Sequence, residues 1–169
     1  RTRKPQWIYS YKYSSNLLYR THLTTGFKAK LYLASFDLKD NSVWCELPFG
    51  KLCFTGGIEF GKSDSIESSV VYVDTLKEFA NTSKPRMLNA RYAHSTTYCD
   101  NYLYVIGGID SDWDLMNDCQ RYNVTLEKGE ALEPLPKECD GLSVIALEET
   151  SCLYALGGDN EFSKPIDLI

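Results

Sequence analysis

The stretch Asn101-Tyr-Leu-Tyr-Val-Ile-Gly-Gly-Ile109 decides the expected fold. Its first half is rich in aromatic and β-branched side chains, which predicts a buried β-strand. The glycine pair that ends it indicates close packing, or a backbone conformation that a side chain would not tolerate. The pattern recurs in Leu52-Cys-Phe-Thr-Gly-Gly57 and Leu153-Tyr-Ala-Leu-Gly-Gly158. From position 57 to 108 and from 108 to 158 the steps are 51 and 50 residues, and such a period is the signature of a repeat architecture.

Each glycine pair has similar neighbours along the chain. A strand that would form a hairpin with the Gly-Gly strand is expected at 42–47, 91–98 and 142–147. A polar loop follows the glycine pair, and a third strand with a central tyrosine follows the loop. The central tyrosines are Tyr19, Tyr72 and Tyr122. A weaker outer strand is expected at 27–33, 76–80 and 130–135. Four antiparallel strands in about 50 residues are what one blade of a β-propeller contains.

These units resemble kelch repeats, which have a hydrophobic strand ending in Gly-Gly, a loop, and then a tyrosine strand followed by an aromatic residue. That aromatic is usually tryptophan in the family, whereas Phe79 takes its place in one unit here and the next unit has none. The resemblance covers roughly residues 16–169. It implies an all-β fold: an incomplete kelch-type β-propeller of about three and a half four-stranded antiparallel blades.

The expected organisation is an N-terminal strand or extension over 1–15 and a propeller fragment over 16–169. The blade units are expected at 16–34 (partial), 42–84, 91–135 and 141–169 (partial). Propellers typically close with about 4–8 blades. Open sheet edges are an aggregation hazard, so we expect a fragment of a longer chain, with self-association through open blade edges as the alternative. The residues expected to be structural in the repeat are Gly56, Gly57, Gly107, Gly108, Gly157, Gly158, Tyr72 and Tyr122.

Aromatic residues alternate near the start of the chain, at positions 7, 9, 11 and 13, and would share one face of a strand. We interpret this segment as an additional strand, either separate or belonging to the preceding blade. The alternative is an aromatic platform that stacks single-stranded nucleic acid beside the cations at positions 1, 3 and 4. The net charge of −5 argues against nucleic acid as a partner, because nucleic-acid modules normally present a basic face.

The six cysteines include no Cys-x-x-Cys pair, and neither His22 nor His94 has a cysteine at zinc-ligand spacing, so no metal site is expected. Buried reduced thiols are the favoured interpretation, which indicates a cytoplasmic protein. A disulfide between Cys45 and Cys53, which flank one hairpin, is the alternative and would indicate an oxidising compartment. No apolar run approaches the length of a membrane span.

The loops after the Gly-Gly strands, at 58–67, 109–117 and 159–165, are expected to share one face and to carry the binding residues. The candidate partner-binding residues are Asp110, Asp112, Trp113 and Asp114, since an exposed tryptophan is a common interface anchor and acids around it would select a basic partner. A tryptophan folded back over the sheet is the alternative. The kelch resemblance adds Arg91 and His94 as rim or structural positions, with a structural hydrogen bond as the favoured role.

No Gly-x-Ser-x-Gly elbow, P-loop or metal-binding histidine pair occurs in the sequence. The sequence therefore predicts a non-enzymatic protein-interaction module, a kelch scaffold or adaptor whose partner is a protein of unknown identity. No cofactor, nucleic-acid partner or membrane contact is expected. Two alternatives remain: a kelch-type enzyme acting on a sugar or small metabolite, with its site completed by missing blades, and a purely structural role in a larger assembly.

Overall fold

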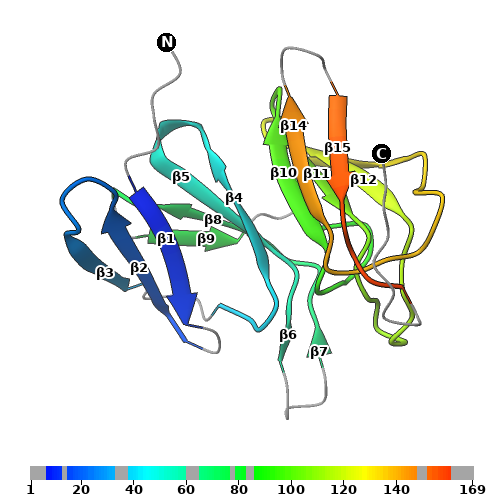
Figure 1. Cartoon of the computed structure of the whole chain (residues 1–169), viewed down its shortest axis with the longest axis horizontal. Coiled ribbons are helices and arrows are strands. Elements are labelled where there is room, and N and C mark those ends of the chain that lie inside the picture. Colours follow the sequence, from blue (N-terminus) through cyan, green and yellow to red (C-terminus); the bar gives the residue numbers. More distant parts are fainter. Residues whose placement is uncertain are drawn as a thin grey trace.

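Antiparallel sheets follow one another along the computed structural model, which describes residues 7–12, 15–32, 38–59, 65–76, 79–82, 86–147 and 152–160 (Figure 1). The first sheet has the order β1-β2-β3, with β1 Trp7–Lys12, β2 Leu17–His22 and β3 Lys28–Tyr32. The second has the order β4-β5-β8-β9, formed by Val43–Leu47, Lys51–Thr55, Val70–Asp74 and Phe79–Thr82. The third has the order β10-β11-β12-β13, formed by Ser95–Cys99, Tyr102–Ile106, Cys119–Asn123 and Lys128–Leu132.

The last sheet is the hairpin β14-β15, formed by Ser143–Leu147 and Cys152–Leu156. A short hairpin of β6 (Ile58–Glu59) and β7 (Ser65–Ile66) follows the first glycine pair and extends beyond the ends of the longer strands (Figure 1). A single 3₁₀ turn, Pro48–Gly50, joins β4 to β5. The expected all-β, incomplete propeller of four-stranded antiparallel units is thereby confirmed.

The blades sit side by side because β10 lies against both β4 and β14, the first strands of the neighbouring sheets. Three apolar clusters fill the spaces between successive sheets. The cluster between the second and third sheets contains Leu47, Cys53, Leu103, Val105 and Tyr122, all buried. Burying such side chains between layers is the main stabilising term in a fold of this kind, at roughly 25 cal/mol per Å² of apolar surface.

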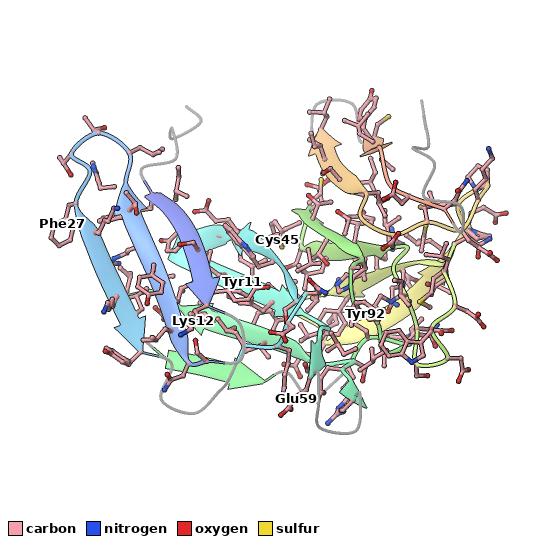
Figure 2. All side chains as sticks on the ribbon, turned by 60° about the horizontal axis from the view of Figure 1, so that its bottom comes forward. Tyr11, Lys12, Phe27, Cys45, Glu59 and Tyr92 are labelled. Atoms are coloured by element: carbon pink, nitrogen blue, oxygen red, sulfur yellow. The ribbon has the colours of Figure 1, made fainter. Side chains whose placement is uncertain are left out.

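Residues 7–12 pair with β2 along their whole length and so belong to the first sheet. Tyr11 contacts Phe54 of the second sheet edge-on with 5.5 Å between the ring centroids, and Tyr9 contacts Trp44 in the same way at 6.2 Å. Figure 2 shows Tyr11 between the first and second sheets, whereas Phe27 points away at the outer edge. These two tyrosines thus serve packing between blades and do not form an open stacking platform. The residues at positions 1–6 and 13 lie outside the described part of the chain.

Several strands begin or end a few residues from the expected positions. β10 begins at Ser95, because residues 91–94 form a connector in which Ala93 has a positive φ of 51°. β9 begins at Phe79 and continues to Thr82, since its register pairs Asp74 with Phe79. The side chain of Phe79, expected to replace the family's tryptophan, lies outside the described part of the structure. Among the described residues, no helix has the length and apolarity that a membrane crossing requires.

Candidate functional site

The loop-bearing face is built from the same backbone contact in three blades. The residue after each glycine pair forms an antiparallel β-bridge with the connector that leads into its own blade. Both backbone hydrogen bonds of each bridge are present, at 2.8–3.1 Å. These six residues, which we call the rim, are Asp40 with Ile58, Tyr92 with Ile109, and Asp140 with Asp159. The rim holds the base of each loop against the rigid blades.

The glycine pairs join each blade to the next at this face. A Cβ on Gly56 would lie 2.2 Å from the carbonyl oxygen of Arg91, and one on Gly107 would lie 2.6 Å from that of Cys139. Both carbonyls belong to the following blade. The second glycine of these two pairs donates its N–H to the same carbonyls, at 3.0 Å from Gly57 to Arg91 and 2.9 Å from Gly108 to Cys139. A side chain at the first glycine would therefore push adjacent blades apart.

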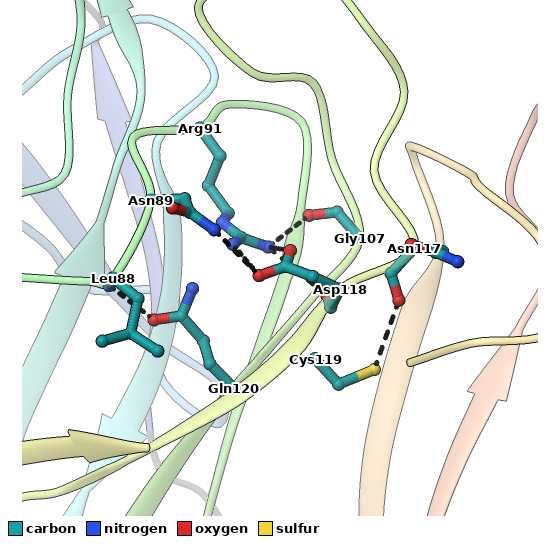
Figure 3. A network of polar contacts seen from close by, with 8 residues as sticks. All are labelled: Leu88, Asn89, Arg91, Gly107, Asn117, Asp118, Cys119 and Gln120. Atoms are coloured by element: carbon teal, nitrogen blue, oxygen red, sulfur yellow. Dashed lines mark hydrogen bonds and ion pairs between the residues drawn. The ribbon is translucent and has the colours of Figure 1, made fainter. Parts of the chain in front are cut away.

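Arg91 is fully buried beneath the loop face, with an exposed fraction of 0%. Its guanidinium donates to the carbonyl oxygen of Gly107 at 2.9 Å and to Oδ2 of Asp118 at 2.7 Å (Figure 3). The second carboxylate oxygen of Asp118, Oδ1, lies 2.6 Å from Nη1 as an ionic contact and makes no hydrogen bond. A buried cation requires such a partner, because an unpaired one would pay a large desolvation cost. Arg91 holds the end of β11 to the start of β12 and presents no surface to a partner.

His94 is also buried, and its Nε2 lies 2.8 Å from the hydroxyl of Thr55 in the preceding blade. That hydroxyl is in turn 2.8 Å from the hydroxyl of Thr96. Burial, and then the positive charge of Arg91, lower the pKa of His94 to about 3. The imidazole is therefore neutral near pH 7 and links two blades through a polar contact in the interior.

The loop from Asp110 to Asp114 is shaped by its first residue. Oδ1 of Asp110 accepts from the backbone N–H of Asp112 at 2.8 Å and of Asp114 at 3.1 Å. Trp113 has a positive φ of 68°, which is uncommon for a bulky side chain. Its indole remains 52% exposed and contacts the ring of Tyr92 edge-on, with 5.9 Å between centroids. Trp113 thus packs against Tyr92 of the rim, while about half of its surface stays exposed. The side chains of Asp112 and Asp114 are exposed to solvent.

The four loop candidates are thus brought together at the surface, whereas Arg91 and His94 lie beneath it. The other two loops are described in part, since residues 60–64 and 161–165 lie outside the described structure. Three further residues join the same face without having been singled out from the sequence: Tyr92, Asp140 and Asp159. Each occupies a rim position, so aligning the three units on their glycine pairs would have found them.

The electrostatics of this face are acidic. Burial, and then the charge of Asp159, raise the pKa of Asp140. Burial, and then the charge of Asp140, raise the pKa of Tyr92. Two cations next to rim residues in the sequence are already paired, Lys39 with Glu59 and Arg91 with Asp118. Negative charge around Tyr92 is therefore left without a compensating cation among those residues.

Comparisons with known proteins agree with this geometry. The family model of the Kelch motif matches residues 90–128, which include most of the third sheet. Kelch-like protein 38 of Homo sapiens is 30% identical over 114 residues, which are 68% of this chain and 19% of that protein. The same protein of Mus musculus is 28% identical over 114 residues, with the same coverage. The chain thus spans about a fifth of the length of the curated relatives it matches.

Among solved structures, that of YjhT is similar to this chain with a TM-score of 0.71 at 12% sequence identity. The similarity covers 91% of this chain and 59% of that chain. At this level of identity the likeness concerns the fold alone, and it supports the interpretation of the four successive sheets as propeller blades.

Proposed function

Because this chain belongs to the kelch-repeat family, we propose that it is a non-enzymatic protein-interaction module that binds a partner protein through the loops after its Gly-Gly strands. In this proposal it acts as a scaffold or adaptor. The rim supports it, because loops on a rigid framework lose little conformational entropy when they bind.

The observation that carries the proposal is the exposed ring of Trp113. Tryptophan offers a large apolar surface and one N–H donor, and it is enriched among residues that dominate binding energy. The Asp110 turn fixes the backbone of the loop, and Tyr92 supports one edge of the indole. The ring is thus pre-positioned, which lowers the entropy lost on association.

The test uses the chain to capture partners from a cell lysate, followed by titration of a purified captured protein. We expect Trp113→Ala to weaken binding by more than about 1 kcal/mol, or at least about fivefold in Kd. The matched control is Phe49→Ala. Phe49 is also an aromatic residue with positive φ (65°) and is 91% exposed, but it lies in the tight hairpin at the opposite end of the strands. Equal affinity for the wild type and Trp113→Ala would remove this loop from the proposed interface.

We also propose a cytoplasmic location. Cys45 and Cys53 lie directly opposite each other on β4 and β5, and both are thiols. Burial raises the pKa of Cys45 to about 12, so its reactive thiolate is scarcely populated. Two facing thiols suit a reducing compartment, where disulfides rarely persist. Mass spectrometry of the protein alkylated directly in cell extract tests this, and a Cys45–Cys53 disulfide in the native source would contradict it.

The enzyme alternative is also open to a direct test. Its strongest titratable candidate in the described part of the chain is His94, whose hydrogen bond to Thr55 and pKa of about 3 suit packing between blades. The assay measures turnover of a sugar or small metabolite. Activity that is kept in His94→Gln but lost when a surface acid is removed would support the enzyme alternative, with its catalytic site elsewhere than at His94.

A further inference from the structure

The rings of Trp113 and Tyr92 form one wall of a small acidic surface. Tyr92 is almost completely buried and supports the indole edge-on, while about half of Trp113 remains open. The bridge to Ile109 holds the Tyr92 backbone in the rim, and the Asp110 turn shapes the loop that carries Trp113.

Two carboxylates of the next blade form the other side. The N–H of Gly141 donates to the carbonyl oxygen of Ala93 at 2.9 Å, which places the residue after Asp140 beside the residue after Tyr92. Asp140 is joined in turn to Asp159 by both hydrogen bonds of their bridge. The backbone of Asp140 is therefore held next to that of Asp159 and close to the connector that carries Tyr92, and the side chain of Asp159 is exposed.

Among the residues that the structure describes, no recorded ion pair includes Asp140 or Asp159, whereas three other acids of the chain have a cation as partner. Arg121 is paired with Glu130, Arg91 with Asp118 and Lys39 with Glu59. By contrast, the pKa of Asp140 is raised by burial and then by the charge of Asp159, and the pKa of Tyr92 is raised by burial and then by the charge of Asp140.

From this geometry we propose that Tyr92, Trp113, Asp140 and Asp159 form a binding site for the guanidinium of an arginine in a partner segment. A guanidinium is planar, stacks on indole faces and donates to two carboxylates at once. A lysine ammonium would supply the positive charge. It cannot stack on the indole face, and it lacks the planar set of donors that reaches two carboxylates at once. The inference rests on the proposed function, since it assigns the chemistry of the partner at the same face.

The experiment selects peptides from a random display library on the immobilised 169-residue chain. We expect arginine to be enriched in the peptides that Trp113→Ala no longer binds. The selected peptide is then resynthesised with citrulline in place of that arginine, which keeps the shape and removes the charge. Both citrulline and the double substitution Asp140→Asn, Asp159→Asn should weaken binding about tenfold or more. Applied together they should weaken it little further, because they remove the same contact.

The matched control is Asp100→Asn. It removes the same charge from an exposed residue of the β10–β11 turn, at the opposite end of the strands, and asparagine tolerates the positive φ of 49° there. It should leave the affinity unchanged. Thermal unfolding of each variant confirms that the fold is intact.

The outcomes separate the two proposals. Peptides that depend on Trp113 but show no arginine enrichment, or whose citrulline form binds equally well, would overturn the arginine site and leave the protein-binding face standing. A lysine preference with no loss on the double asparagine substitution would also overturn it. If neither peptides nor captured proteins depended on Trp113, the binding face itself would be lost, and the arginine site with it.

Discussion

Arg91 and His94 lie in the interior between adjacent blades, where polar residues need defined partners. Arg91 finds them in Asp118 and the Gly107 carbonyl, and His94 in Thr55. Nε of Arg91 and Nδ1 of His94 have no hydrogen-bond partner, so the hydrogen-bonding capacity of these two side chains is only partly used. Buried polar contacts of this kind stabilise one arrangement of the blades over others, because a displaced blade would leave the same groups unpaired.

The pKa of His94 makes a prediction about stability and pH. Its folded-state value of about 3 lies below the value of about 6.5 expected in the unfolded chain. Neutral His94 therefore contributes fully above pH 6.5, and this contribution is lost as the pH falls below that value. Between about pH 7.5 and pH 5 the wild type should lose on the order of 2 kcal/mol more unfolding free energy than His94→Gln, which cannot titrate.

Urea unfolding at the two pH values measures this difference. An independent readout in the wild type alone is the His94 ring resonance in NMR spectra, which should not shift down to about pH 4. A His94 that titrates near pH 6.5 would show that the imidazole is not buried as described.

At the scale of the element, the repeating units resemble one another more in their glycine pairs and connectors than in the sequences of their strands. The connector positions Asn41, Ala93 and Gly141 all have positive φ, from 51° to 62°, although they are three different residues. The first glycine of each pair also has positive φ, but only Gly56 and Gly107 meet a carbonyl of the following blade. No atom lies within 4 Å of a Cβ built on Gly157.

Gly56→Ala and Gly157→Ala therefore form a matched pair. Both place alanine at a φ near +60°, which costs about 1–2 kcal/mol. Gly56→Ala should cost roughly 1–3 kcal/mol more, because its Cβ would meet the Arg91 carbonyl. Chemical unfolding monitored by tryptophan fluorescence gives both values. Equal losses would mean that contact with the next blade does not constrain the first glycine.

At the scale of the whole molecule, the two outer sheets present different surfaces. The outward side of β14–β15 is apolar and about half exposed at Ile145, Leu147, Tyr154 and Leu156. The outward side of the first sheet carries exposed lysines at Lys12, Lys28 and Lys30 beside exposed Ile8 and Tyr32 (Lys12 is labelled in Figure 2). The three clusters between blades are built from apolar residues. Head-to-tail closure between copies would set those lysines against an apolar face, which disfavours it.

The open β14–β15 face predicts concentration-dependent association of the isolated 169-residue chain. Ile145→Thr with Leu156→Thr should shift the chain toward monomer, because these substitutions remove exposed apolar surface and threonine, being β-branched, is well tolerated in strands. Ile8→Thr, on the outward side of the first sheet, is the control and should have no effect. Sedimentation velocity decides between them. Equal association of the two variants would place the contact elsewhere.

Part of the candidate site could be predicted from the sequence. Trp113 and the three acids were found because a tryptophan in a polar loop after a Gly-Gly strand stands out without any tertiary information. Tyr92, Asp140 and Asp159 were missed, because each is unremarkable in its own segment and stands out only when the three units are aligned on their glycine pairs. They matter through bridges between residues that are 17 to 19 positions apart, as in Tyr92 with Ile109 and Asp140 with Asp159.

By itself, the sequence determined the all-β class, the period of about 50 residues and the four-stranded unit. These features follow from local patterns: alternating apolar residues set the strands, and glycine pairs mark where the backbone must pass close to a neighbour. Only the tertiary structure decided which polar residues are buried and which are presented. Arg91 is buried because the next strands enclose it, whereas Trp113 stays exposed because Asp110 and Tyr92 hold it outward. Burial depends on contacts between distant residues, such as Arg91 with Gly107 and Asp118, which are 16 and 27 positions away, and no local window of sequence contains both partners.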